Sequence, residues 1–150
     1  MKSLYLEDFE VGQKFITAGR TVTESDIGWF AGLSGDITSL SINTEAARMS
    51  EFGGRIAQGM LGSSIRFGLW VWLGLMDLNG IAVLETNWRY VLPIRPGDTI
   101  HAECEITKVK PSSKGIPKGT VFVKLTGVNQ LEEVVQEANM VYLIKARGMY

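Results

Sequence analysis

The chain of 150 residues has the usual length of one folded domain, and its 45% hydrophobic content is enough to build a core. Its 15 Lys and Arg residues nearly balance 16 Asp and Glu residues, and no basic run with interleaved aromatics marks a nucleic-acid surface. We therefore expect a single domain over residues 1–150 and no nucleic-acid partner.

The N-terminus and the cysteine content predict where the protein works. Glu7 and Asp8 occur before any apolar signal region can develop, and the single Cys104 cannot form an internal disulfide. Neither a histidine pair nor a cysteine cluster occurs at the spacing of metal ligands. These observations predict a cytoplasmic protein with no metal site and no cofactor.

The first third of the chain predicts a strand followed by short helices. Residues 14–22 carry several Thr, Ile, Val and Phe side chains, which favour an opening strand. Residues 23–26 have the Ser/Thr-x-x-acid pattern of a capped helix start, and Gly35 can take the positive φ of a helix end. A second short helix is expected over residues 44–49, with Asn43 as its N-cap.

The segment 58–76 is apolar nearly all round a helix. Its length is compatible with a membrane span, but Arg66 near its middle and its many glycines favour a helix wrapped by a sheet. We therefore predict one buried helix over residues 58–75 and no membrane partner.

Strands dominate the rest of the chain. A strand is expected over 81–92, followed by a turn at 96–98 and a strand from 100 that alternates apolar and polar residues. Further strands are expected over 120–128 and 134–146, separated by turn residues. A strand, then helices, then consecutive antiparallel strands predict the α+β class.

Two positions in this pattern suggest chemistry on a carbonyl. The backbone N–H groups that open the long helix at Gly59 can hold an oxygen that gains negative charge. Asp36, on the turn after the first helix, can act as an acid or a base beside an apolar pocket. The alternative is a turn residue whose carboxylate bonds nearby backbone N–H groups.

At these residues the sequence resembles the MaoC-like hydratases, a branch of the hotdog fold that adds water to acyl-CoA thioesters or removes it. The family loop reads glycine, aspartate, any residue, asparagine, proline, leucine, histidine, and residues 35–41 here read Gly-Asp-Ile-Thr-Ser-Leu-Ser. Ser41 therefore stands at the catalytic histidine position. Gln58 replaces the histidine of a histidine-glycine pair, and Gly59 is kept. Residues 88–98 and 110–115 also resemble family segments.

The resemblance implies a hotdog fold, in which an antiparallel sheet wraps a long central helix. It places Asp36, Gly59 and Ser41 at the catalytic site and Gln58, Thr38 and Asn43 among the substrate-binding residues. The alternative for Thr38 and Asn43 is that they only shape the loop. The segment Ser112, Ser113 and Lys114 resembles the part near the nucleotide of coenzyme A, with a flexible surface loop as the alternative. The implied partners are an acyl-CoA or acyl-carrier-protein thioester and at least a second copy of the chain.

Because Ser41 cannot act as a base near neutral pH, three functions stay open. The first is an enoyl-CoA type hydratase or dehydratase with a degenerate active site. The second is a repurposed hotdog enzyme of a specialised pathway, for thioester hydrolysis, isomerisation or cyclisation. The third is a non-catalytic subunit that binds acyl thioesters.

Overall fold

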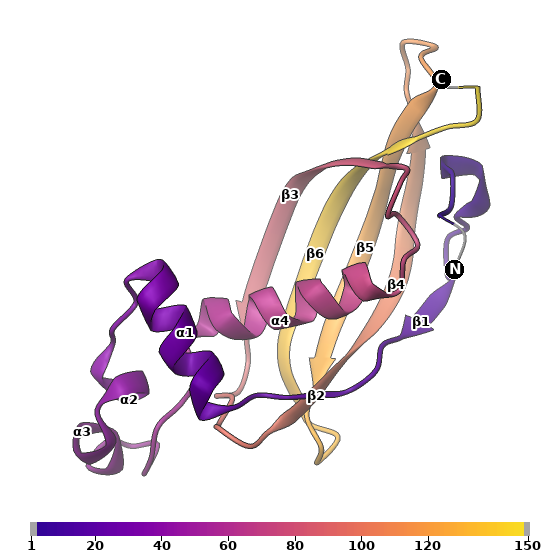
Figure 1. The fold of residues 1–150 in the computed structure, drawn as a ribbon. Helices are drawn as coiled ribbons and strands as arrows, with labels where there is room; N and C mark the ends of the chain where they lie inside the picture. The colour runs from indigo at the N-terminus through magenta and orange to yellow at the C-terminus, as the bar shows by residue number, and fades with distance from the viewer. Residues whose placement is uncertain (1–2, 149–150) are drawn as a thin grey trace.

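The computed structural model describes residues 3–148 and places a long helix across one face of an antiparallel sheet (Figure 1). The helices are η1 (Leu6–Asp8, a 3-10 helix), α1 (Glu24–Ser34), α2 (Ser39–Ile42), α3 (Thr44–Arg48) and α4 (Gly59–Trp72). The strands are β1 (Lys14–Ile16), β2 (Arg20–Thr21), β3 (Gly80–Tyr90), β4 (Thr99–Pro111), β5 (Lys118–Val128) and β6 (Val134–Lys145). Their order is β1-β4-β5-β6-β3, with β2 also on β4, so the predicted α+β class is confirmed.

The predicted opening strand over 14–22 is interrupted. At Thr17 a side chain takes part in the pairing with β4. The Thr17 N–H donates to the Ala102 carbonyl at 3.0 Å, and Thr17 Oγ1 accepts from the Ala102 N–H at 2.8 Å. The Ala102 N–H, which would bond a backbone carbonyl in a continuous strand pair, thus bonds a side-chain hydroxyl instead. Two short strands, β1 and β2, result.

Helix α1 begins and ends where its sequence signals predicted. Thr23 Oγ1 accepts from the Asp26 N–H at 3.1 Å, and Asp26 Oδ2 accepts from the Thr23 N–H at 2.8 Å, which completes a capping box. Gly35 closes the helix at a φ of 76°. Asn43 Oδ1 accepts from the Ala46 N–H at 3.0 Å and caps α3, as expected, whereas the four-residue α2 was not predicted.

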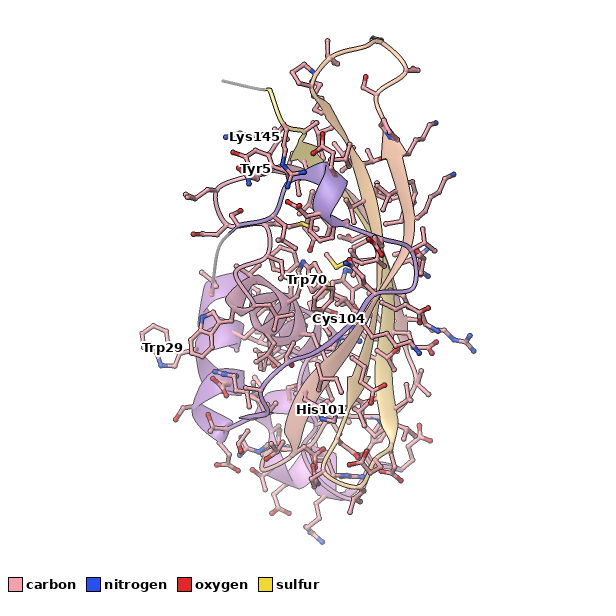
Figure 2. The ribbon with its side chains drawn as sticks, turned by 90° about the vertical axis from the view of Figure 1, so that its right-hand side faces the viewer. Tyr5, Trp29, Trp70, His101, Cys104 and Lys145 are labelled. Carbon is pink, nitrogen blue, oxygen red and sulfur yellow. The ribbon has the colours of Figure 1, made fainter. Side chains whose placement is uncertain are left out.

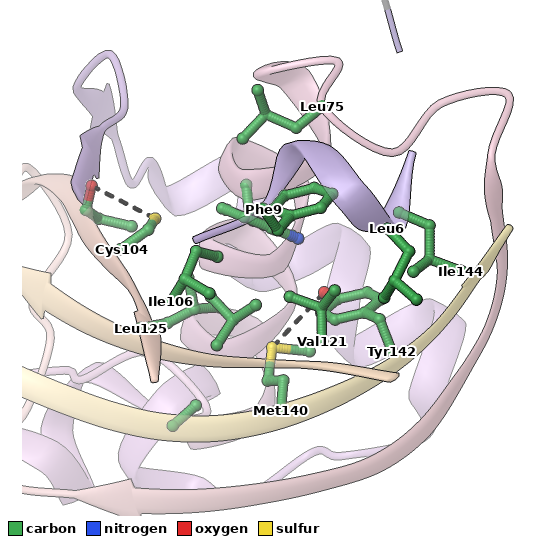
Figure 3. Close-up of a cluster of buried hydrophobic side chains, with 14 of the residues drawn as sticks. Leu6, Phe9, Leu75, Cys104, Ile106, Val121, Leu125, Met140, Tyr142 and Ile144 are labelled. Atoms are coloured by element: carbon green, nitrogen blue, oxygen red, sulfur yellow. Dashed lines mark hydrogen bonds between the residues drawn. The ribbon is translucent and has the colours of Figure 1, made fainter. Parts of the chain in front are cut away.

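The main core lies between α4 and the sheet, and η1 closes one end of it (Figure 3). Its buried side chains include Leu6, Phe9, Trp70, Cys104, Ile106, Val121, Leu125, Met140, Tyr142 and Ile144. Figure 2 shows Trp70 and Cys104 between the helix and the sheet, whereas Trp29 points away from the molecule. Burial raises the pKa of the Cys104 thiol to about 12, so this cysteine is a core residue rather than a nucleophile.

The prediction that the central helix is buried on all sides is wrong for the single chain. One side of α4 contacts the sheet, but Met60 is 54% exposed, Val71 49% and Trp72 86%. The helix also ends at Trp72, earlier than the predicted residue 75. The sheet covers only one side of α4, because its strands lie in one layer (Figure 1). Within residues 3–148, no helix combines the length and apolarity that a membrane span requires.

Candidate functional site

The turn after α1 holds Asp36 half-buried at the surface. Thr38 donates from both its hydroxyl and its N–H to Asp36 Oδ1, at 2.7 and 3.3 Å. Ser34 Oγ accepts from the Asp36 N–H at 3.1 Å and donates to the Phe30 carbonyl at 2.6 Å, which ties the turn to the last turn of α1. Thr38 thus fixes one carboxylate oxygen of Asp36.

Gln58 connects this turn to the start of α4. The side chain is only 4% exposed, and its Nε2 donates to the Ile27 carbonyl at 3.2 Å and to the Asp36 carbonyl at 3.3 Å. Its Oε1 is buried with no hydrogen-bond partner within residues 3–148. One side chain therefore joins α1, the Asp36 turn and the N-terminus of α4.

Gly59 opens α4 against the ring of Tyr90. A Cβ atom at Gly59 would lie 2.9 Å from Tyr90 Cε1, closer than side chains normally approach, so a larger residue there would have to displace the Tyr90 ring. The first N–H groups of a helix have no acceptor within the helix and carry the positive end of its dipole. The start of α4 is therefore suited to a carbonyl or enolate oxygen.

A pocket of about 290 Å³ lies beside Gly59. Its wall is mostly apolar and is made by Phe52, Ile56, Ala57, Gly59, Tyr90, Val91, Leu92, Pro93, Ile94 and Gln136. A larger groove of about 860 Å³ follows the outside of α1 past Trp29 to Leu61, but its lining includes neither Asp36 nor Gly59 among the described residues. Of the two, only the smaller pocket is lined by Gly59, and Asp36 lines neither of them among the described residues.

Ser41 lies on α2, the short helix that follows the Asp36 turn, and Asn43 lies between α2 and α3. Ser41 is 2% exposed, and its N–H donates to the Thr38 carbonyl at 2.9 Å. Asn43 is exposed and uses its Oδ1 as the cap of α3. The structure therefore gives Asn43 a part in shaping the loop, while Ser41 is buried behind the turn.

Ser112, Ser113 and Lys114 lie in the loop between β4 and β5, at the other end of the sheet from α2 and α3 (Figure 1). Ser113 and Lys114 are exposed, and the Lys114 N–H donates to Ser112 Oγ at 3.2 Å. One chain does not bring this loop to the Asp36 turn. A site that uses both segments needs two chains.

Behind Gly59, the buried polar side chains of Ser63, Arg66 and Gln136 form a cluster. Sequence patterns do not predict this cluster. Gln136 Nε2 donates to the Gly59 carbonyl at 3.2 Å, and Ser63 Oγ lies 3.2 Å from the Tyr90 hydroxyl. Arg66 is fully buried and donates from Nη1 to the Gln136 carbonyl at 2.6 Å. The only sequence signal was the charge of Arg66 inside an apolar segment.

Within residues 3–148, Arg66 forms no salt bridge with an acidic side chain. Its guanidinium lies 4.8 Å from the centre of the Trp88 ring, and its Nε and Nη2 have no hydrogen-bond partner within the described chain. Burial lowers the pKa of Arg66 to about 10, so the group stays charged at neutral pH. Gly127 makes room for it, because a Cβ there would lie 2.4 Å from Arg66 Cδ.

Metal chemistry has no visible ligand set in this region. Within residues 3–148, no group of three or more His, Cys, Asp or Glu residues is arranged to hold a metal ion. His101 lies on β4, half-buried, with its Nε2 3.8 Å from Glu103 Oε1. The acid, the helix start and the pocket are therefore the elements available for chemistry.

Comparison with known proteins identifies the family of this chain. The sequence profile of the MaoC like domain matches residues 8–129. The chain is 32% identical over 145 residues to the (R)-specific enoyl-CoA hydratase of Rhodospirillum rubrum, covering 96% of this chain and 94% of that protein. It also matches Protein MaoC of Klebsiella aerogenes at 37% identity over 108 residues, but spans only 32% of the length of that relative.

Solved structures give the same result for the fold. The MaoC-like dehydratase from Rhodospirillum rubrum superposes with a TM-score of 0.88 at 32% identity, covering 98% of this chain and 100% of that one. A Mycobacterium tuberculosis protein described as a double hotdog fold superposes with a TM-score of 0.85 at 17% identity, covering 99% of this chain and 46% of that one. The chain therefore belongs to the MaoC-like domain family and has the hotdog fold.

Proposed function

We propose that the protein is a hydratase or dehydratase of enoyl-CoA type thioesters with an altered active site. The observation that carries the proposal is the link through Gln58, which holds the Asp36 turn against the first turn of α4. The turn that carries Asp36 is thereby tied to the helix start at Gly59, which lines an apolar pocket. The name of the Rhodospirillum rubrum relative, an enoyl-CoA hydratase, supports the same reaction class.

In the hydration direction, the thioester carbonyl of the substrate accepts hydrogen bonds from the N–H groups at Gly59. Asp36 takes a proton from water as the water oxygen bonds to the β-carbon, and the N–H groups stabilise the enolate oxygen. Asp36 then returns the proton to the α-carbon, and dehydration follows the reverse path. In both directions, the hydrogen bonds from Thr38 to Asp36 Oδ1 orient the carboxylate.

Ser41 determines how fast this reaction runs. A hydroxyl can hold the attacking water but cannot accept its proton near neutral pH, so Asp36 manages the proton without a second base. Loss of one member of an acid–base pair typically costs about 10²–10⁴-fold in rate. We therefore expect slow hydration compared with relatives that have a histidine at this position.

The replacement of both family histidines favours a second candidate function. With Ser41 and Gln58 at the two histidine positions of the family, the pocket can serve a repurposed reaction, or can bind an acyl thioester without turning it over. Coenzyme A and a carrier protein present the same thioester, and both fit either function. A cytoplasmic location also stays a prediction.

The proposed assembly is at least a homodimer. Strand β3 forms an unpaired edge of the sheet and carries exposed apolar residues, which is the arrangement that a second sheet covers. An antiparallel pairing of two sheets would place the Ser112–Lys114 loop of the partner at the end of the assembly where Asp36 lies (Figure 1). The loop could then contact the nucleotide part of coenzyme A.

The test of the reaction is hydration of crotonyl-CoA by the native protein, Asp36→Asn and Glu45→Gln. Asp36→Asn keeps the acceptor for Thr38 but removes the base, so we expect a rate roughly 10²–10⁴-fold lower. Glu45 is an exposed carboxylate on α3 paired with Arg48, and Glu45→Gln should leave turnover unchanged. Equal native and Asp36→Asn rates would contradict the proposed role, and binding of acyl-CoA without turnover would favour the second function.

A further inference from the structure

Arg66 is a fully buried cation that forms no salt bridge within residues 3–148. Its Nη1 donates to the Gln136 carbonyl at 2.6 Å, while its Nε and Nη2 have no hydrogen-bond partner in the described chain. Burying a charge without an ion partner costs free energy, and an apolar side chain of similar volume would fill the same space at a lower cost. Folding stability therefore does not explain this charge.

The position of Arg66 on α4 relates this charge to the helix start. Arg66 follows Gly59 by about two helical turns, so both residues lie on the same side of the helix, with Cα atoms about 10 Å apart. Long side chains of a helix lean toward its N-terminus, which brings the guanidinium closer to Gly59 than its own Cα atom. The sheet side of α4 therefore carries a positive charge behind the N–H groups that open the helix.

Gln136 connects Arg66 to the first peptide of α4. Its backbone carbonyl accepts from Arg66 Nη1, and its side-chain Nε2 donates to the Gly59 carbonyl at 3.2 Å. Gln136 is 2% exposed and lines the pocket beside Gly59, whereas the lining described for this pocket does not include Arg66. Arg66 thus acts on a ligand of this pocket only from behind, through its charge and through Gln136.

The neighbours of Arg66 accommodate the charge without neutralising it. Gly127, the register partner of Gln136 on β5, leaves room for the arginine, because a Cβ atom there would overlap Arg66 Cδ. The guanidinium lies 4.8 Å from the centre of the Trp88 ring, whose face attracts a cation. Glu137 follows Gln136 on β6, so its carboxylate points to the opposite face of the sheet.

We propose that Arg66 is a positioning residue of the helix start, where it strengthens the binding of a negatively charged oxygen at Gly59. The inference rests on the proposed function, since that oxygen belongs to the thioester enolate. The substrate carbonyl is neutral and the enolate is anionic, so a nearby positive charge stabilises the enolate more than the bound substrate. At about 10 Å and an effective dielectric constant of about 20, this difference corresponds to roughly tenfold in rate.

The test is the absorption of bound hexadienoyl-CoA, a conjugated thioester whose band moves to longer wavelength when its carbonyl is polarised. This measurement needs binding and not hydration. Arg66→Met removes the charge but keeps most of the volume, and it should lose roughly half or more of the red shift seen with the native protein. Arg66→Lys keeps a positive charge and should stay closer to the native value. As a control, Arg48→Met removes an exposed charge of α3 and should keep the red shift.

Crotonyl-CoA hydration gives the second measurement. Arg66→Met should lower kcat roughly tenfold with little change in KM, because the charge acts on the enolate and not on the neutral thioester. A native red shift in Arg66→Met would overturn the role of Arg66 and leave the hydratase function intact. A lost red shift in Arg66→Met, with no turnover by the native protein, would support Arg66 and contradict the hydratase function. No red shift with the native protein would overturn the inference.

Discussion

The Asp36 turn and the interior behind Gly59 meet at the start of α4 but are built in different ways. The turn lies at the surface, and one buried side chain, that of Gln58, connects it to α4. The interior holds a fully buried Arg66 and glycines that side chains contact too closely for a Cβ atom. The acid therefore depends on a few hydrogen bonds, whereas the helix start depends on packing.

This difference separates effects on activity from effects on stability. Changes in the interior should lower the free energy of unfolding, because buried volume and hydrogen bonds are lost together. Changes in the turn should act mostly on the rate, because an exposed segment contributes little to stability.

The largest effect on stability is expected at Arg66. Arg66→Ala empties the space between Gly127 and Trp88 and leaves the Gln136 carbonyl without its donor, at a cost of about 2–5 kcal/mol in the free energy of unfolding. Arg66→Met refills most of that volume without a buried charge, so its loss should be below about 1.5 kcal/mol. Chemical denaturation measures both, and equal losses would show that the charge stabilises the fold.

The pH dependence of this difference follows from the lowered pKa of Arg66. Because the folded-state pKa is about 10, below the ordinary value of 12.5, the charged guanidinium opposes folding at every pH below about 10. That opposition decreases as the pH rises through 10. The stability of the native protein relative to Arg66→Met should therefore be constant from neutral pH to about 9 and should rise above it.

Two glycines of α4 give the next largest effect and a matched pair. A Cβ at Gly62 would lie 2.5 Å from Ile94 Cδ1 and 2.6 Å from Gln136 Nε2, so Gly62→Ala should cost about 1–3 kcal/mol by overpacking. Gly68 lies on the same helix with nothing within 4 Å of its Cβ position. Gly68→Ala should instead stabilise by up to about 1 kcal/mol, through helix propensity. Similar thermal midpoints for both variants would contradict the close packing behind Gly59.

The smallest effect on stability is expected at Gln58, where the two regions meet. Gln58→Ala removes both hydrogen bonds of Nε2, and we expect a loss of about 1–2 kcal/mol with a larger fall in kcat than change in KM. Gln130→Ala is the control: it removes the hydrogen bonds of another glutamine side chain, at an exposed turn, and should cost below about 0.5 kcal/mol. If kcat stays native in Gln58→Ala, Gln58 does not position Asp36.

Local signals in the sequence predicted much of the fold. The capping box at Thr23 and the glycine at position 35 marked both ends of α1, and apolar alternation marked β4. The all-round apolar helix was misread because the apolar residues of its outer side, including Trp72, are exposed in one chain. A sequence pattern does not distinguish a side that a sheet covers from a side left open in the single chain.

The candidate site was predictable only where it follows a motif. Asp36 and Gly59 stand at family positions, but the cluster of Ser63, Arg66 and Gln136 depends on α4 meeting β6 across about 70 residues of sequence. No spacing rule relates these positions, since the strand order sets the contact. The link from Gln58 to the Asp36 carbonyl likewise needs the fold, because its acceptor is a backbone atom with no sequence signature.

Comparing crotonyl-CoA hydration by the native protein and by Ser41→His tests whether Asp36 manages the proton alone. If Asp36 alone manages the proton, the native protein should show slow turnover, and a neutral imidazole at position 41 should raise it by supplying a second base. Thr38 and Ser39 also differ from the family loop. We therefore expect a gain in rate of roughly tenfold, which is less than the 10²–10⁴-fold effect of a matched acid–base pair. No turnover by either protein, with acyl-CoA still bound, would contradict the hydratase account.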